Sequence, residues 1–117
     1  MANEMDNIMN PVEDDDALTN ITVRDIVGNN SYENITLYPE NTLGDLLDVL
    51  AEEAGKVGNS EAANLFRDST VKKTFRIKSP DPSRGKPTSN YNVSMEQFGL
   101  RSDDIILLDN DGSVGGF

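Results

Sequence analysis

The chain has 117 residues, enough for one domain with one modest core, and its 10 Lys and Arg against 21 Asp and Glu give a formal net charge of −11. This charge argues against binding to nucleic acid or to an anionic membrane surface, because both attract clustered cations. The chain has no cysteine and no histidine, which removes thiol nucleophiles, Ser-His and Cys-His catalytic pairs and the usual zinc ligands. We therefore expect a protein that is not an enzyme and binds no metal. Its acidity suits a basic protein partner, or it simply keeps the chain in solution.

Residues 1–19 are predicted to be a disordered acidic leader. They contain six carboxylates, no Lys or Arg and no sustained apolar period. The start of the chain has neither the basic segment nor the apolar segment of a secretion signal, and no stretch is apolar enough to cross a bilayer. We therefore expect a cytoplasmic protein. The run at residues 14–16 is interpreted as a solvated charge run and not as a metal site.

The ordered domain is predicted to begin with a hairpin at residue 20. The β-branched residues of 21–27 alternate well at first and less well later, and a second alternating run follows at 34–38. Gly28 to Ser31 lie between these runs and tolerate the left-handed conformations of a tight turn. Two such strands around a turn indicate a β-hairpin.

A helix is predicted next, because five apolar residues fall on one helical face (Leu43, Leu46, Leu47, Leu50 and Ala54). Thr42 can cap its first turn, with Asp45 as the acid of a capping box. Gly55 is predicted to end the helix.

A shorter helix over 60–68 and a strand over 71–78 are predicted to follow. In the strand, Val71, Phe75 and Ile77 are expected to face inward, whereas the opposite positions are Lys72, Thr74, Arg76 and Lys78. This basic strand face has two interpretations. It is a solvated surface that balances nearby acids, or Lys72, Arg76 and Lys78 form a docking face for an acidic partner or for the leader of another copy of the chain.

The last elements are a loop, a single helical turn and a strand. Residues 79–90 are rich in proline and small polar residues and are predicted to be a loop. Ser94 with Gln97 fits a capping box, and Gly99 fits a C-terminal cap. The continuous apolar run at 105–108 is typical of a strand in the middle of a sheet. Residues 110–117 are predicted to be a flexible tail ending Gly-Gly-Phe.

The order of these elements and the segment 93–108 (Val-Ser-Met-Glu-Gln-Phe-Gly-Leu-Arg-Ser-Asp-Asp-Ile-Ile-Leu-Leu) resemble ubiquitin-like proteins. The resemblance implies an α+β, ubiquitin-like β-grasp fold over residues 20–109, in which a mixed sheet has one helix packed across it. Compared with ubiquitin, the chain has an extended insertion between this helix and the last strands. In this fold Met95, Phe98 and Leu100 would close the open end of the sheet.

The tail Gly115-Gly116-Phe117 extends the resemblance to protein modifiers, in particular to the ubiquitin-like modifiers of bacteria. Residues without Cβ make a slim tail that fits narrow enzyme channels. The resemblance implies a precursor that is cut after Gly116, the residue that becomes the acyl group. It also implies an activating enzyme, a carrier enzyme and a JAB-type peptidase as partners. The resemblance further implies that the chain itself binds no cofactor and that the activating enzyme uses ATP.

Two features of the tail bear on its partners. Asp109 and Asp111 make it acidic, whereas the tail of ubiquitin is basic, so a dedicated set of conjugating enzymes is implied. One alternative is a non-conjugated binding module, similar to the YukD-like proteins, which lack a diglycine tail. A less favoured alternative is a sulfur carrier similar to ThiS and MoaD, whose diglycine is already terminal.

Overall fold

A computed structural model of the chain describes residues 16–26, 28–81 and 83–110. Most of the predicted leader and residues 111–117 of the predicted tail lie outside these residues. The strands are β1 (Leu18–Asp25), β2 (Asn30–Leu37), β3 (Lys73–Ile77) and β4 (Ile105–Asn110). The helices are α2 (Leu43–Lys56), α3 (Ser60–Arg67) and α4 (Met95–Phe98). Among these described helices, none is long and apolar enough to cross a membrane.

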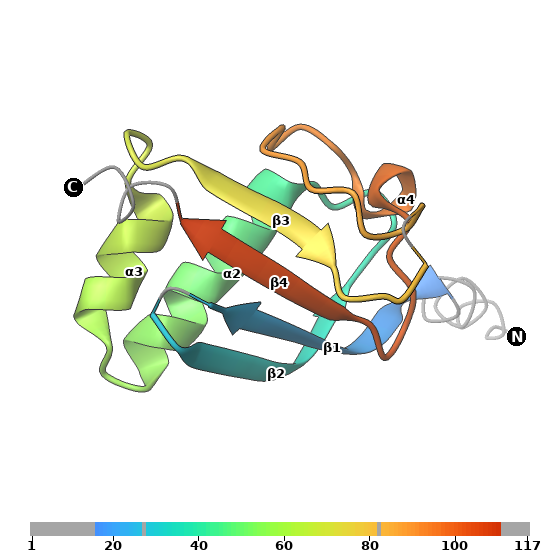
Figure 1. The fold of residues 1–117 in the computed structure, drawn as a ribbon. Coiled ribbons are helices and arrows are strands. Elements are labelled where there is room, and N and C mark those ends of the chain that lie inside the picture. Colours follow the sequence, from blue (N-terminus) through green and yellow to red (C-terminus); the bar gives the residue numbers. More distant parts are fainter. Residues whose placement is uncertain (1–15, 27, 82, 111–117) are drawn as a thin grey trace, which may run out of the picture.

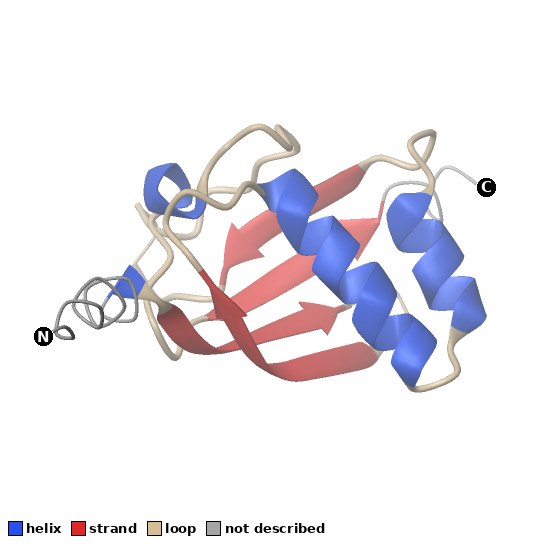
Figure 2. Ribbon diagram, turned by 180° about the vertical axis from the view of Figure 1, so that it is seen from behind, coloured by secondary structure: helices blue, strands red, loops and turns tan. Residues whose placement is uncertain are grey.

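The four strands form one mixed sheet in the order β2-β1-β4-β3. The two central strands, β1 and β4, are parallel, and each outer strand is antiparallel to its neighbour. Helix α2 crosses one face of the sheet, as the view from behind shows (Figure 2), and α3 lies beside it. The other face carries no helix (Figure 1). This is the predicted α+β, ubiquitin-like β-grasp fold, with α3 and the long loop before α4 forming the predicted insertion.

The core lies between α2 and the sheet and consists of side chains that point inward from every strand and from α2. Each of them is almost completely buried: Ile21 and Val23 of β1, Ile35 and Leu37 of β2, Phe75 and Ile77 of β3, Ile106 and Leu108 of β4, and Leu43, Leu46, Leu47, Leu50 and Ala54 of α2. The apolar face predicted for the helix is therefore confirmed. Burial of this set supplies the main free energy of folding.

Helix α2 begins as predicted and ends later than predicted. The hydroxyl of Thr42 accepts a hydrogen bond from the Asp45 amide at 3.1 Å, and the Asp45 carboxylate accepts one from the Thr42 amide at 3.0 Å. Gly55, however, lies inside the helix, so its assignment as the stop was wrong. The left-handed residue that ends the helix is Gly58, with φ 81°, after which the Asn59 amide donates to the Ala54 carbonyl.

Both hairpin strands begin earlier than their alternation indicated, and β1 ends at Asp25, before the end predicted for it at residue 27. Strand β1 begins at Leu18, in the segment predicted as leader, and Leu18 pairs with Leu37 and packs against the core. The register shifts twice along the hairpin, beside Asn20 and Asn34, which have φ of 57° and 59°. These bulges interrupt the period of two, so the alternation in the sequence understates both strands.

Strand β3 differs from its prediction at its first inward position. Val71 is only half-buried, and Lys73 is the inward residue, with a side chain about 2% exposed. Its ammonium group donates to the carbonyls of Asp68 at 2.7 Å and Val71 at 2.9 Å. Burial lowers the pKa of Lys73, and the nearby Asp68 charge opposes this shift. The lysine is tolerated because it satisfies two carbonyls of the turn between α3 and β3.

The segment around α4 confirms its predicted capping. Ser94 and Gln97 form the capping box, and Gly99 is left-handed with φ 83°. Met95 and Leu100 are buried and Phe98 is half-buried against the core, so this turn closes one end of the sheet. The preceding loop is fixed by Arg84, which forms an ion pair with Asp104 and donates to the Gly99 carbonyl.

Leu50→Ala should lower the free energy of unfolding by about 2–5 kcal/mol, because Leu50 is fully buried and the helix cannot collapse into the space left behind. Urea denaturation measures the change. The matched control is Val57→Ala, at a site 75% exposed, which should change the stability by less than about 0.5 kcal/mol. Equal small effects for both variants would contradict the packing of α2 on the sheet.

Tyr32→Phe should be neutral or stabilising by up to about 1 kcal/mol at neutral pH, because the buried Tyr32 hydroxyl has no hydrogen-bond partner among the described residues. Burial, and then the charge of Asp25, raise the pKa of Tyr32. The unfolded chain therefore ionises first, so this residue's contribution to stability falls as the pH rises above about 10.

Urea denaturation of both proteins between about pH 7 and pH 11 tests this. The wild-type protein should lose stability relative to Tyr32→Phe only at the alkaline end of the range. A difference that does not change with pH would contradict the described environment of the hydroxyl. Tyr38→Phe, which removes an exposed hydroxyl, is the control at neutral pH.

Candidate functional site: the outer face of the sheet

The face of the sheet that α2 does not cover is called here the outer face, and its centre is aliphatic. Leu107 of β4 pairs with Arg24 of β1 on one side and with Arg76 of β3 on the other. Ile105 pairs with Thr22, and its carbonyl accepts a hydrogen bond from the Lys78 amide at 2.8 Å. Ile105 and Leu107 are both half-buried. The outer face therefore presents two aliphatic side chains with cationic residues on both sides.

One end of the outer face is hollowed. A depression of about 320 Å³ is lined by Ile26, Thr74, Arg76, Pro87, Leu107 and Asp109. Ile26 is 50% exposed. The depression combines apolar walls with a guanidinium and a carboxylate. This combination can hold an apolar side chain while charged groups at the rim fix its orientation.

Of the predicted docking residues, Arg76 lies on this face in β3, where it pairs with Leu107. Lys72 and Lys78 directly precede and follow β3, and all three residues are exposed. Sequence analysis missed Arg24 and Ile26, which reach the same face only through the pairing of β1 with β4. The four cations Arg24, Lys72, Arg76 and Lys78 are four of the chain's ten Lys and Arg. A strongly acidic chain thus carries four cations on or beside one face of its sheet.

The predicted conjugation tail, Gly115, Gly116 and Phe117, lies outside the described residues. The described chain ends at Asn110, which pairs with Lys73 at the start of β3. Because Lys73 also contacts the Asp68 carbonyl, the point where the tail leaves the sheet lies beside the C-terminal end of α3 (Figure 1).

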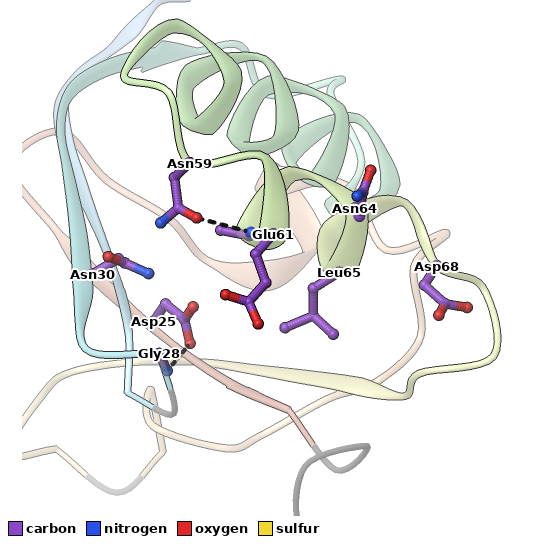
Figure 3. Close-up of a pocket in the computed structure, with 9 residues that line it drawn as sticks. Asp25, Gly28, Asn30, Asn59, Glu61, Asn64, Leu65 and Asp68 are labelled. Carbon is purple, nitrogen blue, oxygen red and sulfur yellow. Dashed lines mark hydrogen bonds between the residues drawn. The ribbon is translucent and has the colours of Figure 1, made fainter.

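A second hollow, of about 530 Å³, lies between the hairpin turn and α3 (Figure 3). It is called here the polar hollow and is lined by Asp25, Gly28, Asn30, Asn59, Glu61, Ala62, Asn64, Leu65 and Asp68. Three of these residues are carboxylates and none is a cation. The carboxylate of Glu61 extends from α3 toward that of Asp25 (Figure 3).

Two of these carboxylates are held by local hydrogen bonds. Asp25, almost fully buried, accepts from the Gly28 amide at 3.0 Å, and a Cβ at Gly28 would lie 2.6 Å from its other oxygen. Asp68 accepts from the amide and hydroxyl of Thr70, which lowers the pKa of Asp68. In the described part of the chain, no group of three or more His, Cys, Asp or Glu could hold a metal ion. The polar hollow is therefore suited to hydrogen-bond donors and cationic side chains.

Comparisons with known proteins identify the fold. No family model matches the chain, and no curated protein matches it. Among solved structures, the UBL domain of yeast Ddi1 is similar, with a TM-score of 0.51 over 80% of this chain and 90% of that one. The sequence identity is 19%, so this likeness concerns the fold alone. The chain has a ubiquitin-like β-grasp fold.

Proposed function

We propose that the chain is the precursor of a ubiquitin-like protein modifier, cut after Gly116 and then activated and conjugated through this glycine by partner enzymes. The observation that carries the proposal is the position of the diglycine. Gly115 and Gly116 follow the end of the central strand β4 by five and six residues. Six residues extend about 20 Å, enough to bring a terminal carboxylate out of the fold and into a narrow enzyme channel.

In this proposal the chain supplies only the acyl group. A JAB-type peptidase hydrolyses the Gly116–Phe117 amide, which frees the Gly116 carboxylate. The activating enzyme joins that carboxylate to AMP from ATP and releases pyrophosphate. A thiolate of the activating enzyme then displaces AMP and forms a thioester, which passes to a cysteine of the carrier enzyme. A lysine amine of the target finally displaces the thiol. The nucleophilic cysteines belong to the partners, so a chain without cysteine or histidine suits this role.

The charge beside the tail supports partners dedicated to this chain. Asp68 lines the polar hollow and lies next to the strand pair at which β4 ends, and Asp25 and Glu61 line the same hollow. An enzyme that reads the tail from this end of the molecule would meet an acidic surface. We therefore expect basic groups on the activating enzyme at this position.

The second candidate function is that of a non-conjugated binding module. The observation that favours it is the outer face, where Leu107 lies between two arginines and beside the depression lined by Ile26. Such a surface can bind a partner without any reaction at the tail. The two functions differ in whether Gly115 to Phe117 are required.

Mixing the purified chain with the peptidase and activating enzyme of its own genome should remove one phenylalanine, which intact mass spectrometry detects. With ATP, the trimmed chain should then form a thiol-sensitive adduct on the activating enzyme. Gly116→Ala should slow both steps, because a methyl group is poorly accommodated in a channel shaped for glycine. Gly112→Ala, in the same tail but away from the cut bond, is the matched control.

Deleting Phe117 should bypass the peptidase and still require the activating enzyme. If the full-length chain stays uncut and works equally well without residues 115–117, the modifier proposal fails. The binding-module function would then replace it.

Glu61→Lys, introduced into the chain lacking Phe117, should slow adduct formation about tenfold at low salt, because it places a cation in the acidic surface that faces the activating enzyme. The rate of adduct formation, followed on gels, measures the effect. The control is Glu52→Lys, at an exposed site of α2. Equal rates for both variants would show that the enzyme does not contact the polar hollow.

A further inference from the structure

Three cations of the outer face have no side-chain partner among the described residues. Arg24, Arg76 and Lys78 are exposed, and none of them forms an ion pair or a side-chain hydrogen bond with any residue in the described ranges. Arg24 and Arg76 lie on opposite sides of Leu107, and Lys78 directly follows the last residue of β3. A chain with a net charge of −11 thus carries a localised positive surface.

The segment of the same chain that best complements this surface is the acidic leader. Residues 4–16 contain six carboxylates and no cation: Glu4, Asp6, Glu13, Asp14, Asp15 and Asp16. Between these acids lie Ile8, Met9 and Val12. In the leader, apolar residues lie between carboxylates, and on the outer face, aliphatic residues lie between cations. The two are therefore complementary in charge, and each has its apolar groups between its charged ones.

The leader also starts at the right place to reach this surface. Asp16 is exposed and lies two residues before Leu18, the first residue of β1. The Thr19 carbonyl accepts from the Asp103 amide on one side of the start of β4, and the Lys78 amide donates to the Ile105 carbonyl on the other side. Thr19 and Lys78 therefore both lie at the end of the sheet where β4 begins.

Length does not prevent the contact. The 12 residues from Asp16 back to Glu4 span up to about 40 Å when extended, whereas the distance along β3 from Lys78 to Lys72 is about 20 Å. A tethered segment of this length has an effective concentration on the order of millimolar at a nearby site of the same molecule. Contact within one molecule is thereby favoured over contact between two.

We propose that residues 4–16 fold back over the outer face of their own molecule, with Ile8, Met9 and Val12 on Ile105 and Leu107 and the carboxylates beside Arg24, Arg76 and Lys78. The leader then acts as an internal competitor for this face. A partner that binds the outer face must displace it, so acidic partners bind more weakly to the full chain than to a chain without the leader. This inference does not depend on conjugation through Gly116.

A single spin label tests the contact directly. Because the chain contains no cysteine, Met9→Cys provides a unique attachment site in the full-length protein. A paramagnetic label broadens the signals of nearby amides, so in the ¹H–¹⁵N spectrum the cross-peaks of the Arg24, Leu107 and Arg76 amides should lose most of their intensity. The amides of Asp48 and Glu52, on α2 at the opposite side of the sheet, should keep theirs.

Three further measurements decide the interpretation. Arg76→Glu combined with Lys78→Glu should abolish the intensity loss, whereas the control Arg67→Glu on α3 should not. Raising the wild-type protein to about 1 M salt, where the Debye length is about 3 Å, should also reduce the loss and requires no substitution. Mixing ¹⁵N-labelled chain without the spin label with unlabelled chain that carries it should give no loss.

The proposal fails if the label affects both sides of the sheet equally or affects neither side. It also fails if the loss is unchanged by salt, because the contact would then not be electrostatic. A loss in the mixed sample would assign the leader to a second copy of the chain, and this outcome too would overturn the contact within one molecule.

Discussion

The parallel pairing of β1 with β4 is the constraint on which the rest of this molecule depends. It joins residues about 80 positions apart through hydrogen bonds from the Thr22 amide to the Asp104 carbonyl at 3.1 Å and from the Ile26 amide to the Leu108 carbonyl at 3.0 Å. On the side facing α2 this pairing brings buried residues of both strands together, and on the other side it places Arg24 next to Leu107. The same pairing anchors β4 in the centre of the sheet, so the tail begins from a rigid point.

The insertion after α2 changes one end of the fold without disturbing the central pair. Helix α3 packs beside α2, with the ring of Phe66 edge-on to Tyr32 at a centroid distance of 5.8 Å. Lys73 then ties the turn after α3 to the first pair of β3 and β4. The result is that the polar hollow, which is acidic, lies next to the end of β4, whereas the outer face of the sheet carries cations. The described part of the molecule therefore presents two surfaces of opposite charge.

Sequence analysis predicted the elements whose signals are local. The capping boxes at Thr42 and Ser94 and the apolar face of α2 need only neighbouring residues, and each is present in the structure. The bulges at Asn20 and Asn34 and the burial of Lys73 were missed, because they depend on pairing and on distant carbonyls. For the same reason only the β3 part of the outer face could be predicted. Arg24 and Ile26 reach the outer face through the register of β1 against β4, which cannot be read from either strand alone.

Conjugation would leave a chemical trace that can be read on the target proteins. The chain contains no Lys or Arg after Arg101, so trypsin would leave residues 102–116 attached through Gly116 to a target lysine. Mass spectrometry of tryptic peptides from the cells that make this protein measures this branched peptide directly. The account predicts lysines carrying residues 102–116 without Phe117. Recovery of the C-terminal peptide only in its linear form, ending at Phe117, would contradict it.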